Sequence, residues 1–160
     1  MNRAALTGFL KVGIVFAFLA CAGLCIAEAL LPYTDAAEYM LRDPASMRLP
    51  CIAIGVAMLI PIVLAFIAFW KVVDNIARDK SFCADSAKRM KQIGLCAAVD
   101  LVLSLGAFAV LLVGLRNRLG VCLAELVVFA LGFVTAAAAF LLSGLIAKAS
   151  SMQEEIDLTV

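Results

Sequence analysis

Histidine is absent from this 160-residue sequence, and charged residues make up only 16% of it. Without histidine, the chain lacks the side chain that most often serves as a general base or a metal ligand. The formal net charge of +1 provides no basic surface suited to direct nucleic-acid binding. A phosphate-binding glycine loop and a nucleophile elbow are also missing. These absences predict a protein that is not an enzyme and that has no catalytic residues, cofactor or metal site.

Apolar residues, in contrast, account for 66% of the chain, against roughly 45–50% in a soluble domain. A water-soluble fold of this size has too little interior to bury so many apolar side chains. Four apolar runs, at residues 12–31, 51–73, 93–115 and 121–146, each reach the roughly 20 residues that cross a bilayer as a helix. The sequence therefore predicts an all-α integral membrane protein. We expect one domain over residues 1–160, folded as an antiparallel bundle of four transmembrane helices.

The segments between the apolar runs differ in character. We expect an outer loop at residues 32–50, a basic inner loop at 74–92, a tight turn at 116–120 and a polar, mobile tail at 150–160. In the outer loop, Asp35 and Glu38 resemble a capping box for a short interfacial helix over 36–41. The stretch Ala27-Glu28-Ala29 fits a signal-peptidase site, but the preceding apolar run is long for a signal peptide, so we expect it to remain a helix.

Lysine and arginine are distributed unequally between the two sides of the predicted membrane. Nine lie on the side of the termini and the 74–92 loop: Arg3, Lys11, Lys71, Arg78, Lys80, Lys88, Arg89, Lys91 and Lys148. Four lie on the other side: Arg42, Arg48, Arg116 and Arg118. Because positively charged segments stay in the cytoplasm, both termini are predicted to be cytoplasmic. The expected location is the bacterial cytoplasmic membrane.

Three acidic residues, Glu28, Asp100 and Glu125, lie inside the apolar runs. A charged side chain at the bilayer centre costs roughly 2.5–3.5 kcal/mol on insertion scales. Helical spacing places each acid on a stripe of small residues, and Ser104 shares the stripe of Asp100. Since small residues mark the contacts between membrane helices, we expect the acids to face other helices. The stripes are Ala17, Cys21, Cys25 and Glu28; Cys96, Asp100, Ser104 and Ala107; and Glu125, Gly132, Ala136, Ala139 and Ser143.

Two interpretations of these acids remain open. In the structural one, Glu28 and Glu125 pair with Arg48, Arg116 or Arg118 or stay protonated. Asp100 then bonds to Ser104 or a neighbouring backbone group, or meets Lys11 or Lys148. In the functional one, Asp100, Glu28, Glu125 and Ser104 line a polar site inside the bundle. Four helices are few for a monomeric carrier, so transport through this site would need a homo-oligomer.

The six cysteines are interpreted mainly as small packing residues, because five lie in or beside apolar runs. A disulfide between Cys51 and Cys122 near the outer surface is an alternative. Cys21 and Cys25 share a helix face, but no histidine or second cysteine pair completes a metal site.

The inner loop is the most distinctive polar segment. Ser81 is suited to cap a helix that continues into the third membrane run. The basic residues favour contact with anionic headgroups of the lipid bilayer, which gives a juxtamembrane anchor as one interpretation. The other is a docking surface for a cytosolic protein. The candidate residues for either role are Arg78, Lys80, Phe82, Lys88, Arg89 and Lys91.

The same segment resembles the domain-of-unknown-function 2975 family of small bacterial membrane proteins. The family pattern is Ile-x-x-Gly-Lys-x-Phe, followed by a polar helix that ends in Arg-Leu-x-x-Ile-Gly. Matching positions are Ile76, Lys80, Phe82, Arg89, Ile93 and Gly94, whereas Asp79 replaces the glycine and Met90 the leucine. The resemblance implies four membrane helices, no assigned activity and no catalytic residue to carry over. It also implies a small cytosolic helix-turn-helix regulator as a candidate partner.

The sequence thus predicts an uncharacterised multi-pass membrane protein. The leading functional hypothesis is a non-enzymatic regulatory or sensing component that presents the basic loop to a cytosolic protein. The alternative is a subunit of a small oligomeric transporter or channel that uses the intramembrane acids.

Overall fold

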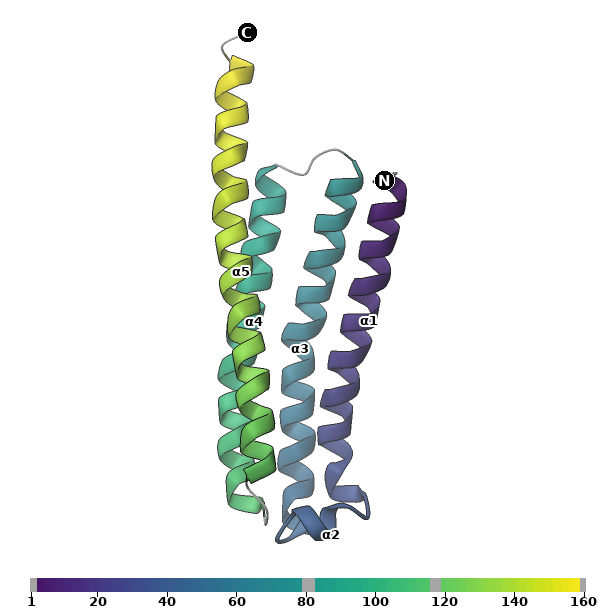
Figure 1. The fold of residues 1–160 in the computed structure, drawn as a ribbon. Helices are drawn as coiled ribbons and strands as arrows, with labels where there is room; N and C mark the ends of the chain where they lie inside the picture. Colours follow the sequence, from purple (N-terminus) through teal and green to yellow (C-terminus); the bar gives the residue numbers. More distant parts are fainter. Residues whose placement is uncertain (1–2, 79–82, 116–118, 159–160) are drawn as a thin grey trace.

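The structure is a computed structural model that describes residues 3–78, 83–115 and 119–158. It contains four long helices: α1 (Arg3–Leu30), α3 (Pro44–Ala77), α4 (Ala84–Gly114) and α5 (Leu119–Leu158) (Figure 1). The short helices η1 (Leu31–Tyr33) and α2 (Ala37–Met40) connect α1 to α3. All four long helices are long and apolar enough to cross a membrane. The predicted all-α class with four membrane-length helices is confirmed.

The start of α3 corrects the predicted outer loop. The helix begins at Pro44 with Asp43 as its N-cap, whose carboxylate accepts a hydrogen bond from the Ala45 N–H at 3.2 Å. Proline is favoured at the first helical position because its fixed backbone angle suits the helix and no hydrogen bond is lost there. The prediction of a loop up to residue 50 is wrong, because Pro50 lies inside α3, as does Pro61.

The short helix α2 occupies the predicted segment but is not capped as predicted. Its N-cap is Ala36, which makes no side-chain capping bond. The turn is stabilised instead by Thr34, whose hydroxyl donates to the carbonyl of Leu31 at 2.8 Å and whose carbonyl accepts from the Ala37 N–H. A carboxylate cap was therefore unnecessary, and the capping-box prediction for Asp35 and Glu38 is wrong.

The start of α4 and the end of α5 also differ from prediction. Helix α4 starts at Ala84, and its N-cap is Cys83, whose Sγ accepts from the Ser86 N–H at 3.4 Å. The predicted cap, Ser81, lies outside the described residues. Helix α5 continues through Leu158, so the predicted mobile tail is helical as far as the structure describes it. In Figure 1 this last part of α5 projects beyond the other helices.

The long helices pack as neighbours in sequence order: α1 on α3, α3 on α4, and α4 on α5. A buried cluster joins the last three helices and consists of Ala68, Val72, Met90, Ile93 and Ala139. Within the described part of the chain, α1 and α5 make no comparable contact. The four-helix bundle is therefore open along the side between α1 and α5, which we call the open side.

The small-residue stripes predicted from the sequence largely form these contacts. Cys96, Ser104 and Ala107 are buried on α4, and Ala136 and Ala139 on α5. On α1 only Cys25 is buried, whereas Ala17 and Cys21 are exposed. The α1 stripe is therefore buried only at Cys25, where the backbone of α1 lies close to Gly55 of α3.

Two contacts between a cation and an aromatic ring mark opposite ends of the bundle. The Lys11 Nζ lies 4.9 Å from the Trp70 ring, and the Arg48 guanidinium lies 5.1 Å from the Tyr33 ring. Along α3, Arg48 and Trp70 are 22 residues apart, which corresponds to about 33 Å of helix. This separation matches the roughly 30 Å hydrocarbon core of a bilayer. The two contacts lie where amphipathic rings and long cationic side chains meet the headgroups.

Candidate functional site

Three of the four predicted polar-site residues come together near the open side. Ser104 on α4 is buried, and its hydroxyl donates a short hydrogen bond to the carboxylate of Glu125 on α5. Glu28 on α1 interacts electrostatically with Glu125. Because α1 and α5 are not packed together, this interaction spans the open side of the bundle. Ser104 and Glu125 thus link α4 to α5, whereas Glu28 is near enough to Glu125 to interact with it although α1 and α5 are not packed together.

Asp100 lies deeper on α4. It is 16 residues from the helix start at Ala84 and 14 from its end at Gly114, or about 24 Å and 21 Å of helix. The Asp100 side chain is half-buried, and its Oδ1 atom is fully buried with no hydrogen-bond partner. It also interacts electrostatically with the thiols of Cys25 and Cys96.

Two of the side-chain partners proposed for Asp100 from sequence are engaged elsewhere, and the third, Lys148, is exposed. Ser104 bonds to Glu125, and the Lys11 Nζ forms an ion pair with Asp74 at 2.7 Å. Arg48, proposed for the outer acids, lies over the Tyr33 ring instead. Arg116 and Arg118 are outside the described residues. In the described part of the chain, no basic side chain forms an ion pair with Glu28, Asp100 or Glu125.

This group of carboxyls has a definite chemical capacity. Each carboxyl can hold or release a proton, and together they can attract a cation. Among the described residues, no three His, Cys, Asp or Glu side chains are arranged to hold a metal ion. Cys51 and Cys122, the proposed disulfide pair, are both free thiols, and the Cys51 side chain is buried. The site is therefore a set of acids with one hydroxyl, on three different helices.

A second polar group ties the end of α3 to the start of α4. The Asn75 amide donates to the Asp85 carboxylate and to the Ser86 hydroxyl, both at 3.2 Å. The Ser86 hydroxyl lies 3.2 Å from the Cys83 Sγ, and its hydrogen bond lowers the pKa of this thiol because it stabilises the thiolate. Sequence reasoning missed Asn75 and Ser86. Their positions, one small polar residue on each side of the loop, could have predicted a hydrogen bond across it.

The predicted docking residues are only partly described. Lys80 and Phe82 lie outside the described residues. Arg78, Lys88 and Lys91 are exposed, whereas Arg89 is half-buried and forms an ion pair with Asp85 at 3.5 Å. The described part of the basic loop therefore presents three exposed cations around the junction of α3 and α4.

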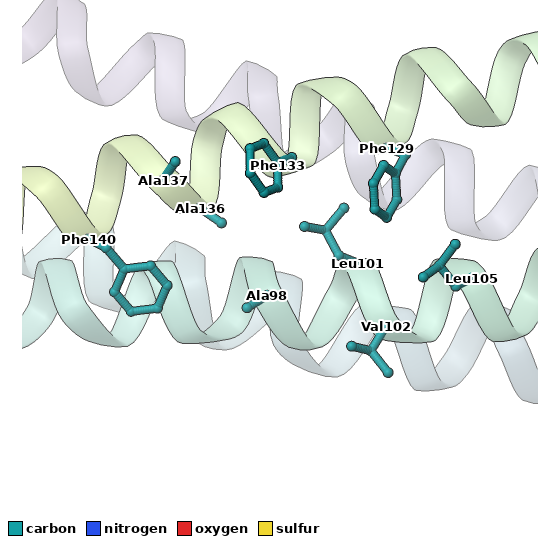
Figure 2. Close-up of a pocket in the computed structure, with 9 residues that line it drawn as sticks. All are labelled: Ala98, Leu101, Val102, Leu105, Phe129, Phe133, Ala136, Ala137 and Phe140. Atoms are coloured by element: carbon teal, nitrogen blue, oxygen red, sulfur yellow. The ribbon is translucent and has the colours of Figure 1, made fainter.

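A groove of about 440 Å³ lies between α4 and α5 on the outside of the bundle. Figure 2 shows Phe129 and Phe133 of α5 beside Leu101 and Leu105 of α4. The side chains that line this groove are all apolar. It has no group that performs chemistry or selects a polar ligand.

Comparisons with known proteins agree with this description. A search of curated proteins and a search of solved structures each gave no match to this chain. A family model described as "Protein of unknown function (DUF2975)" matches residues 33–160, which cover three of the four long helices and most of the chain. The resemblance in the segment around the α3–α4 junction is thereby confirmed. This protein, an all-helical chain with four helices of membrane length, belongs to the DUF2975 family.

Proposed function

We propose that this protein is a non-enzymatic regulatory or sensing component of the bacterial cytoplasmic membrane. The observation that carries this proposal is the continuity of α4. One unbroken helix, Ala84–Gly114, bears Asp100 and Ser104 in its middle and the exposed cations Lys88 and Lys91 near its start. A change in the charge of the acids therefore acts on the same rigid element that presents the basic surface.

The open side of the bundle gives α4 and α5 a direction in which to move. When Glu28 and Glu125 are both ionised, their like charges repel across the open side, and a proton or a bound cation removes that repulsion. Small sliding of packed helices is a common way to transmit such a change. In the proposed mechanism, the acids receive the signal and the junction of α3 and α4 delivers it to a cytosolic protein. The helix-turn-helix regulator implied by the family resemblance is the first candidate partner.

The proposal includes an antiparallel topology with both termini in the cytoplasm. Contacts support it, since Lys11 near the start of α1 meets Asp74 near the end of α3, and Ser143 of α5 donates to the Ala87 carbonyl of α4 at 2.9 Å. The first residues of α1 and the last residues of α5 lie toward the same end in Figure 1. That end also carries the basic loop, which favours the cytoplasmic side.

The partner surface can be tested by photo-crosslinking in cells. A photoreactive residue at Lys88 or Lys91 is expected to crosslink a cytosolic protein, because both positions are exposed beside the junction. The same residue at Tyr39, which is 80% exposed at the opposite end of the bundle, is the control and is expected to capture no such protein. Crosslinked products are identified by mass spectrometry of isolated membranes. The Asp100→Asn variant should change the crosslinking yield at Lys91 at least severalfold.

Two results would contradict the proposal. One is a set of crosslinked proteins that is the same at Lys91 and at Tyr39. The other is a yield at Lys91 that does not respond to Asp100→Asn, which would separate the basic surface from the acids.

A second function, a subunit of an oligomeric transporter or channel, is favoured by a specific observation. The Asp100 Oδ1 atom is buried without a partner, so a proton or cation can occupy it without displacing a bond within the described structure. On this proposal, Asp100→Asn should abolish pH-dependent ion flux into proteoliposomes, because the amide cannot exchange the proton. The control is Glu38→Gln, which removes an exposed carboxylate at the outer end and should preserve the flux. Flux that persists at the original rate in the Asp100→Asn variant would exclude this residue from a pathway.

A further inference from the structure

A second groove lies on the face of α3 near the cytoplasmic end of the span. It measures about 290 Å³ and is lined by Phe66, Ile67, Trp70 and Lys71. The lining is apolar except for Lys71 at the end nearer the membrane surface. The Trp70 ring lies at the level that the cation–aromatic contact with Lys11 marks as the headgroup boundary. The groove therefore runs from the headgroup level into the hydrocarbon.

Two of the residues that line the groove, Phe66 and Trp70, are aromatic, and their ring centroids are 5.8 Å apart. Phe66 also packs on Phe18 of α1, with ring centroids 4.5 Å apart. These tilted ring contacts hold Phe66 and Trp70 in place, so this wall of the groove is preformed. A preformed apolar surface is well suited to an extended hydrocarbon chain. The chain stays in apolar surroundings when it binds, and the protein does not have to rearrange.

The charges at the mouth of the groove are not balanced. Lys11 is neutralised by Asp74, whose carboxylate lies 2.7 Å from its Nζ. Lys71 is exposed, and in the described part of the chain no carboxylate pairs with it. Arg78 is also exposed and follows seven residues later, so it lies on the same helix face about 10 Å nearer the cytoplasm. Two cations therefore flank the mouth, and Asp74, a described carboxylate near it, is already paired with Lys11.

We propose that this groove is a binding site for an anionic phospholipid, whose acyl chain lies along Phe66, Ile67 and Trp70 and whose headgroup phosphate binds Lys71. The position of the groove at the headgroup level and the charge at its mouth both select this ligand. A zwitterionic lipid offers the same hydrocarbon but no net negative charge for Lys71 and Arg78. The lining of the site contains none of the intramembrane acids.

The sequence contains a single tryptophan, which makes the site directly observable. The full-length protein is reconstituted in lipid nanodiscs that contain phosphatidylglycerol or phosphatidylcholine with brominated acyl chains. Bromine quenches Trp70 fluorescence at contact, so titration of one brominated lipid against the other reports their relative affinity for the groove. We expect phosphatidylglycerol to be preferred on the order of fivefold. Lys71→Gln should reduce this preference to about twofold or less, because only Arg78 then remains at the mouth.

Two variants make the result specific. Lys71→Arg keeps the charge and should retain the preference for phosphatidylglycerol. Lys148→Gln removes an exposed cation on α5, outside the groove, and should leave the preference unchanged. Equal quenching by the two lipids in the unmodified protein would overturn the proposal. So would a preference that survives intact in Lys71→Gln, because the groove would then not select the headgroup through Lys71.

Discussion

The Gly55→Val variant is expected to lose about 3 kcal/mol of unfolding free energy. Gly55 is buried on α3 where α1 crosses it. A Cβ atom at this position would lie 2.8 Å from the Cys25 carbonyl oxygen and 2.9 Å from the Ala29 Cβ. Neither neighbour is a flexible side chain, so the two helices must separate. Denaturant titration in detergent micelles measures the loss, and labelling of the buried thiols of Cys25 and Cys51 reports whether α1 has moved away.

The matched control is Gly106→Val on α4. A Cβ at Gly106 meets nothing within 4 Å, and valine has a better helix propensity than glycine. Its unfolding free energy should stay within about 0.5 kcal/mol of the original protein. If the two variants unfolded at the same denaturant concentration with Cys25 and Cys51 still protected, close packing of α1 on α3 would not contribute to stability.

The Leu115→Ala variant is expected to lose about 2–5 kcal/mol of unfolding free energy, because it leaves a cavity in a small buried cluster. This cluster, which we call the outer core, consists of Ala37, Leu41 and Leu115. Leu115 is 1% exposed and packs with Leu41 and Ala37, both also 1% exposed. This outer core lies at the end of α4. Unfolding there exposes its side chains to water and not to lipid, so their burial contributes the full hydrophobic free energy. The adjacent hydrogen bond, from the Arg42 N–H to the Gly114 carbonyl at 2.8 Å, ties the connection between α2 and α3 to α4.

Leu49→Ala is the control for this prediction, since Leu49 is 78% exposed near the same end of the bundle. Its unfolding free energy should change by no more than about 0.5 kcal/mol. Limited proteolysis adds a local measurement, because loss of the outer core should increase cleavage between α2 and α3 in Leu115→Ala alone. Identical proteolysis and identical unfolding of the two variants would show that the outer core does not fasten this connection.

The positions of the four helices follow from hydropathy, because an apolar run of this length has no stable place except across a bilayer. Their ends do not follow from it. Pro50 marks a plausible helix start in the sequence, but Asp43 and Pro44 provide both a side-chain cap and a favoured first residue, so α3 starts earlier. Likewise, the helix α4 begins before its apolar run, at a cysteine cap that general capping preferences rank low.

The candidate site was likewise predictable from the sequence in one respect and not in another. Helical spacing alone determined that Asp100 and Ser104 share a face and that each acid lies among small residues, because the helix repeat is a local property. Spacing cannot determine which faces meet. Only the tertiary structure decided that Ser104 bonds to Glu125 on α5 and that the Asp100 Oδ1 atom has no partner in the described chain. It also decided that Lys11 pairs with Asp74 and that Lys71, at the groove on α3, has no carboxylate partner within the described residues. These pairings depend on the order in which helices pack and on the open side between α1 and α5, and both arise from contacts between residues far apart in the sequence.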